Sequence, residues 1–223
     1  MFSFVLQSTL IMTNTEEQLA ALQDIRKIME RSSRFISLNG LSGVFVGLFA
    51  LAGAALAYLH LSQTNGRVAD DYDAVALVAD KDIWFYCIDA IVVLVLSVGV
   101  STLLSIRKAN KEGLNFWDPT AKRLLLNMLI PLVTGGLFCL ILILHNFLTL
   151  IAPTLLIFYG LALVNSSKYT LEDIRYLGLL EICLGLLAAY FPANGLVFWA
   201  IGFGFLHIVY GIGMYIKYDK KVK

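Results

Sequence analysis

The sequence predicts an all-α integral membrane protein, a bundle of six transmembrane helices with a short N-terminal amphipathic cytoplasmic helix. Of the 223 residues, 59% are hydrophobic and only 15% are charged, whereas soluble domains average about 25% charged residues. The apolar residues also fall in six long runs, each close to the roughly 20 residues that cross the hydrocarbon core of a bilayer. Because these runs are continuous rather than alternating, they predict helices and exclude the strands of a membrane barrel.

We divide the chain into three parts on this pattern. Residues 1–34 form an N-terminal segment, residues 35–216 the transmembrane domain, and residues 217–223 a basic cytoplasmic tail. The six predicted spans, in chain order, are 35–61, 83–106, 124–144, 147–164, 174–191 and 196–216. Spans that follow one another this closely leave no room for a separate soluble domain.

The N-terminal segment is expected to form an amphipathic helix over about 15–33, because its apolar residues recur at helical spacing. Its basic residues lie next to the first span, so the helix either rests on anionic lipid or binds a cytoplasmic protein partner. The segment ahead of it has no basic n-region and is not typical of a signal peptide. Met1 and Met12 are both candidate translation starts.

The positive charges predict the orientation of the bundle, since short loops rich in Lys and Arg stay in the cytoplasm. With the N-terminus inside, every Lys and Arg except Arg67 and Lys81 falls on the cytoplasmic side. We therefore expect both termini in the cytoplasm, in the cytoplasmic membrane of a bacterium. The net charge of +1 argues against nucleic acid as a partner.

Two sequence features are expected to shape the third and fourth spans. Asp118 followed by Pro119 is typical of a helix N-cap with proline at the first helical position. Pro131 and Pro153 interrupt apolar runs, where proline removes a backbone donor and usually bends the helix. Two bent neighbours would open a cavity between them; the alternative is that packing accommodates the bends.

Three ionisable residues lie within the predicted spans and away from their ends, where a charged group costs about 2.5 to 3.5 kcal/mol on insertion scales. They are Asp89, Glu181 and His207. The last two lie at similar distances from a tight turn at 192–195, so antiparallel helices place them at similar depth. Asp89 is expected nearer the outer surface. All three are candidate binding residues; alternatively, Glu181 and His207 form only a polar clasp that fixes helix register.

Glycines lie three residues before and four residues after both Glu181 and His207, and the first span has the same spacing around Gly43. They are Gly40, Gly43 and Gly47 in the first span, Gly178 and Gly185 in the fifth, and Gly204 and Gly211 in the sixth. Residues at this spacing share a helix face, and small residues allow close packing in lipid. We expect spans one, five and six to meet along these faces, with Glu181 and His207 pointing into the bundle.

The motifs indicate no metal, cofactor or usual catalytic site. Sequences typical of nucleotide, ester or zinc-protease chemistry do not occur, and the three cysteines lack CxxC spacing. The sequence favours a carrier or channel for a small solute, a proton or a cation that uses Glu181 and His207. The alternative is a non-catalytic scaffold or regulatory subunit that docks a cytoplasmic partner on its basic face or forms a homo-oligomer. An enzyme is the least favoured class.

Overall fold

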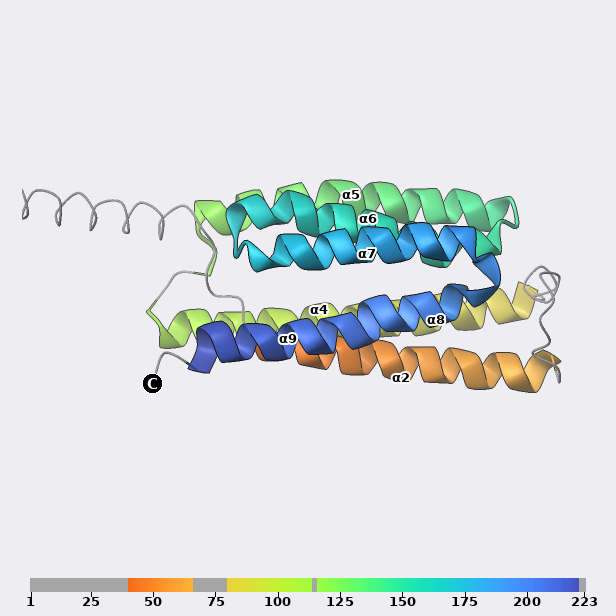
Figure 1. Ribbon diagram of the computed structural model, residues 1–223, viewed down its shortest axis with the longest axis horizontal. Helices are drawn as coiled ribbons and strands as arrows, with labels where there is room; N and C mark the ends of the chain where they lie inside the picture. Colours follow the sequence, from red (N-terminus) through yellow and green to blue (C-terminus); the bar gives the residue numbers. More distant parts are fainter. Residues whose placement is uncertain (1–39, 66–79, 114–115, 221–223) are drawn as a thin grey trace, which may run out of the picture.

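The computed structural model describes residues 40–65, 80–113 and 116–220, and every regular element among them is helical (Figure 1). The predicted N-terminal helix lies outside the described residues, as does the end of the chain from residue 221. Residues 217–219 of the predicted tail continue the last helical segment instead of leaving the bundle.

The helices follow the predicted spans in order. The first four spans correspond to α2 (Gly40–Asn65), α4 (Asp80–Lys111), α5 (Pro119–Leu144) and α6 (Ile151–Ser166), and the fifth to α7 (Asp173–Tyr190). The sixth is composite: α8 (Gly195–Trp199), the π-helical η4 (Ala200–Leu206), α9 (His207–Met214) and the π-helical η5 (Tyr215–Asp219). We call these four segments together the last helix. Short 3₁₀ turns precede α6, follow it and precede α8, at Leu148–Leu150, Ser167–Tyr169 and Pro192–Asn194.

Five helices in the described part of the chain are long and apolar enough to cross a membrane, as in a multi-pass membrane protein. They are Gly40–Gln63, Ile83–Lys111, Pro119–Leu144, Leu148–Tyr169 and Pro192–Tyr218. The helix α7 is not among them, because its 18 residues include Asp173, Arg175 and Glu181. Most of the large apolar side chains of α4 are exposed, among them Ile88, Ile91, Leu94 and Val95, and so large an exposed apolar surface indicates lipid as its surroundings.

Successive long helices run antiparallel and form two groups (Figure 1). The helices α5, α6 and α7 pack together in one group, and α2 packs with α4 and the last helix in the other. The last helix also contacts α6 and α7 through α8 and η4, so it joins the groups. We call this contact the seam. Its apolar core consists of Leu163, Ile174 and Leu177, with Tyr159, Leu206 and Tyr210 packed against them.

Glycines bring the last helix into backbone contact with α2. A Cβ atom on Gly211 would lie 2.6 Å from the backbone nitrogen of Val44 and 2.8 Å from the carbonyl oxygen of Gly40. A Cβ on Gly47 would lie 2.5 Å from the carbonyl oxygen of Gly204, and one on Gly43 3.0 Å from Cα of Gly211. Spans one and six therefore meet along the glycine faces that the sequence singled out.

The glycines of α7 pack against α6 instead. A Cβ on Gly178 would lie 2.7 Å from the carbonyl oxygen of Gly160, and one on Gly185 would lie 2.9 Å from the backbone nitrogen of Ile157. The expectation that span five shares the packing face of spans one and six is therefore corrected. The reason is Gly160, which offers α7 an equally close approach on its antiparallel neighbour.

The expected start of α5 is present. Asp118 is its N-cap and Oδ1 accepts a hydrogen bond from the backbone nitrogen of Ala121 at 2.6 Å, with Pro119 as the first helical residue. Pro131 lies inside α5, whereas Pro153 is the third residue of α6. In a first turn the backbone N–H groups have no partner within the helix, so Pro153 removes no hydrogen bond from inside α6, whereas Pro131 lies in the interior of α5.

Candidate functional site

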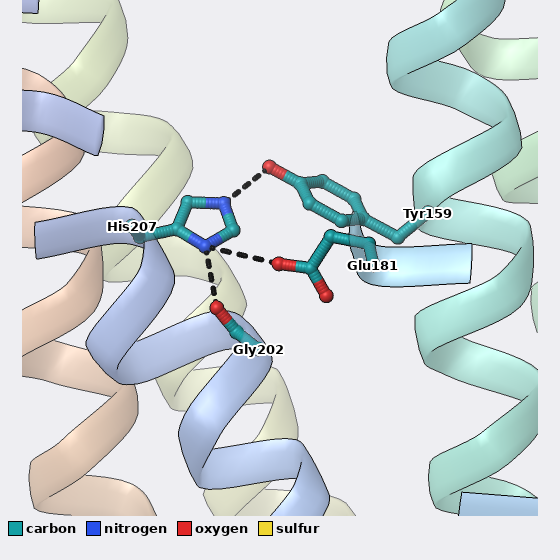
Figure 2. Close-up of polar contacts among 4 residues, drawn as sticks. All are labelled: Tyr159, Glu181, Gly202 and His207. Atoms are coloured by element: carbon teal, nitrogen blue, oxygen red, sulfur yellow. Dashed lines mark hydrogen bonds and ion pairs between the residues drawn. The ribbon is translucent and has the colours of Figure 1, made fainter. Parts of the chain in front are cut away.

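The structure brings two of the three candidate residues together at the seam. Glu181 lies in the middle of α7, and His207 is the first residue of α9. His207 Nδ1 is 3.4 Å from Glu181 Oε1 (Figure 2). Both side chains are inside the bundle, with 0% of Glu181 and 4% of His207 exposed.

Two hydrogen bonds fix the imidazole of His207. Nδ1 lies 2.9 Å from the carbonyl oxygen of Gly202, and because a carbonyl oxygen only accepts, Nδ1 carries a proton. Nε2 lies 2.7 Å from the hydroxyl oxygen of Tyr159 (Figure 2). In the neutral ring Nε2 therefore accepts a hydrogen bond from the Tyr159 hydroxyl, which defines the tautomer and the ring orientation.

The π-helical segment η4 places Gly202 for this arrangement. Gly202 and His207 are five residues apart, and the wide turn between them lets the Gly202 carbonyl accept from the side chain of His207. Such π-helical turns are often found at functional sites. Gly202 also lies directly against Glu181: a Cβ here would be 2.5 Å from Glu181 Oε2 and 2.5 Å from Cδ2 of Leu156. Only glycine allows the last helix to approach the carboxyl group this closely.

The carboxyl group of Glu181 is fully buried. Neither Oε1 nor Oε2 accepts a hydrogen bond from any residue that the structure describes, because the Nδ1 proton of His207 points to the Gly202 carbonyl instead. An unsatisfied buried acceptor costs about 1–3 kcal/mol, and more when it is charged. Groups kept at such a cost within a membrane domain usually bind an ion or a substrate.

Tyr159 belongs to this site but was not singled out from its sequence. It comes from α6, one residue before the glycine that packs against α7. Tyrosines in membrane helices gather at the membrane surface, whereas Tyr159 lies inside the fourth predicted span, five residues before its end. That position, together with the neighbouring Gly160, was the available signal.

Asp89, the third candidate, lies in another part of the molecule. It projects from α4 toward α2, where a Cβ on Gly53 would be 3.2 Å from Asp89 Oδ2. Among the described residues, the hydrogen bonds and the ion pair of Glu181 and His207 do not involve Asp89. Asp89 is therefore a feature of the contact between α2 and α4 and not part of the site at the seam.

A second polar contact joins α7 to the last helix, at the end of the seam where α7 begins. Lys217 donates a hydrogen bond to Asp173 Oδ2 at 2.6 Å, and the hydroxyl of Tyr218 donates to the same oxygen at 2.8 Å. The hydrogen bond from Lys217 lowers the pKa of Asp173 below its ordinary value, with partial burial opposing and the Tyr218 bond adding to this effect. The first turn of α7 is thus tied to the end of the last helix.

The contact of Asp173 with Lys217 and Tyr218 predicts that the protein loses part of its stability in acid. Because the pKa of Asp173 is lowered in the folded protein, the contact stabilises the fold above the unfolded value of about 3.9 and ceases to do so as pH falls through the folded value. We expect wild type to melt slightly above Asp173→Asn in detergent near neutral pH, the small difference typical of an exposed ion pair, and the two to converge in acid. Lys217→Met should lower the melting temperature by a similar amount near neutral pH. A difference between wild type and Asp173→Asn that persists in acid would contradict the role given to Asp173.

No group of three or more His, Cys, Asp or Glu side chains within the described ranges is arranged to hold a metal ion. No family model, curated protein or solved structure matches the chain.

Proposed function

We propose that the protein is a small membrane carrier or channel coupled to protons or a small cation, and that Glu181 and His207 bind the coupled ion. The observation that carries this proposal is the fully buried carboxyl of Glu181, which has no hydrogen-bond donor among the described residues. A bound proton or cation would supply the missing partner. His207, held 3.4 Å away with a defined tautomer, can exchange a proton with it.

We also propose that α7 crosses the membrane with the other five helices, which gives six spans with both termini in a bacterial cytoplasm. The helix α7 lies beside α6 and antiparallel to it (Figure 1). Of its three acidic or basic residues, only Glu181 lies away from its first turn. The described Lys and Arg residues other than Lys81 gather at one end of the bundle, as the positive-inside rule expects of a cytoplasmic face. Reporter fusions at the C-terminus test this orientation.

The same basic end favours the second candidate, a scaffold or regulatory subunit. Lys and Arg from α4, α5, α7 and the last helix lie together there and would attract an acidic protein partner. In that case the pair of Glu181 and His207 would serve only to set the register of α7 against the last helix.

A stability measurement distinguishes the two candidates. Purified protein in detergent is heated with Na⁺, K⁺, Li⁺, amines, carboxylates and amino acids at several pH values, in wild type, Glu181→Gln and the matched control Asp89→Asn. A ligand at about 100 times its dissociation constant adds about 2.7 kcal/mol of stability. Stabilisation that Glu181→Gln abolishes and Asp89→Asn retains supports the carrier or channel. If no ligand and no pH change distinguishes Glu181→Gln from wild type, the scaffold becomes the better account.

A further inference from the structure

Besides Glu181, a second side chain along the seam has a buried polar atom without a hydrogen-bond partner among the described residues. Tyr210 follows His207 by three residues, and its hydroxyl oxygen is buried without a hydrogen-bond partner among the described residues. The ring packs against the apolar core of the seam, which includes Leu177 and Ile174 of α7. Phenylalanine would fill this place without the cost of an unsatisfied hydroxyl, so the hydroxyl calls for another explanation.

Tyr210 lies between the two polar contacts of the seam. Glu181 and Asp173 are eight residues apart on α7, or about 12 Å along the helix, and the last helix runs antiparallel to α7 from His207 to Lys217. Tyr159 and Tyr210 pack against the same apolar core of the seam, and Tyr210 lies between His207 and Lys217 along the last helix. The polar groups therefore form a line from the middle of the bundle to one of its ends.

The space at Glu181 suits a proton better than a larger ion. A single Cβ atom on Gly202 would already come within 2.5 Å of Oε2, and Leu156, fully buried, closes the same side. A metal cation also needs several oxygen ligands, whereas the Gly202 carbonyl is already occupied by His207.

We propose that the coupled ion is a proton, which moves between Glu181 and the end of the seam at Asp173 through Tyr210, Tyr159 and His207. This inference rests on the proposed function, for which it names the ion and its route.

The transfer balances for one proton. A proton that arrives at the Tyr210 oxygen from the side of Asp173 releases the proton of that hydroxyl to the Tyr159 oxygen. The hydroxyl proton of Tyr159 then passes to His207 Nε2, 2.7 Å away. The Nδ1 proton then moves to Glu181 Oε1, 3.4 Å away. Tyr159 is again a hydroxyl, His207 is again neutral with its proton on Nε2, and Glu181 is a carboxylic acid that donates to Nδ1. The Gly202 carbonyl loses its donor, so protonation of Glu181 also releases η4 from the imidazole.

Infrared spectroscopy after a pH jump tests this route in the full-length protein in detergent. The carbonyl band of a protonated carboxyl reports Glu181, and Glu181→Gln assigns the band by removing it. We expect Tyr159→Phe and Tyr210→Phe each to slow the appearance of the band by about 100-fold with the final amplitude unchanged. The matched control is Tyr176→Phe, because Tyr176 also lies on the seam-forming α7 but is 65% exposed; it should keep the wild-type rate.

Each outcome has a separate meaning. A wild-type rate in both Tyr159→Phe and Tyr210→Phe overturns the route and leaves Glu181 as the ion site. A Glu181 band that responds to Na⁺ or K⁺ at constant pH overturns the choice of a proton, and a band that responds to neither overturns the proposed function as well. Tyr210→Phe removes a hydroxyl that has no partner among the described residues and should melt no lower than wild type, so slow protonation in that folded variant would not result from unfolding.

Discussion

Glu181→Met is expected to stabilise the protein by about 1–3 kcal/mol and to abolish binding of the coupled ion. Methionine is flexible, fills irregular space and has a volume near that of glutamate, so it can occupy the same buried position beside Leu156 and Gly202. The substitution removes a carboxyl group whose two oxygens lack donors among the described residues, and removing an unsatisfied buried group recovers its cost. Thermal unfolding in detergent over a series of pH values, with and without Na⁺ or K⁺, measures both effects.

The control for this substitution is Leu180→Met, the neighbouring residue on α7, which is 52% exposed and should leave the stability and the ion response unchanged. His207→Leu should change the stability in the opposite direction. It leaves the Tyr159 hydroxyl and the Gly202 carbonyl without their partner, and each buried polar group left unpaired costs about 1–3 kcal/mol. If Glu181→Met instead destabilises the protein as much as His207→Leu, the carboxyl makes a favourable contact in the fold and serves as a structural clasp.

The positions of the helices were predictable because hydropathy alone marks the apolar segments. Their ends were less predictable: α4 extends from Asp80 to Lys111, beyond the apolar run at 83–106, because a helix continues into polar surroundings that hydropathy does not register as a span. The partner of α7 could not be predicted either. Glycines at the spacing of Gly178 and Gly185 suit any helix with a small residue opposite, and the choice depends on Gly160 of α6.

It was predictable that Glu181 and His207 lie at the same level of the bundle, 3.4 Å apart, because a tight turn fixes the register of two antiparallel helices. The rest of the site depends on rotations about the helix axes. The π-helical turn that aims the Gly202 carbonyl at His207 has no distinct signature in an apolar, glycine-rich stretch. Tyr159 is 48 residues from its partner His207 along the chain, and only the packing of α6 against the last helix brings the two together.

Gly211→Ala is expected to destabilise the protein by about 1–3 kcal/mol, the usual cost of an overpacked core. The added Cβ would meet the backbone nitrogen of Val44 at 2.6 Å and the carbonyl oxygen of Gly40 at 2.8 Å. Neither atom can move without a shift of α2 as a whole. Gly213→Ala is the matched control in the same helix, because nothing lies within 4 Å of its added Cβ. It should be neutral or stabilise the protein by up to about 1 kcal/mol, the difference in helix propensity.

The effect of Gly211→Ala should extend to the site, because the contact with α2 supports the helix that presents His207. A Cβ on Gly43 would lie 3.2 Å from the carbonyl oxygen of His207 itself, so Gly43→Ala is expected to fall between the other two variants in stability. Ion-dependent stabilisation, measured in all three, should weaken in the same order as the melting temperature. If Gly211→Ala has the same melting temperature as Gly213→Ala, the last helix does not pack directly against the backbone of α2. If it melts lower but binds the ion normally, the glycine contact stabilises the bundle without setting the position of His207 against Glu181.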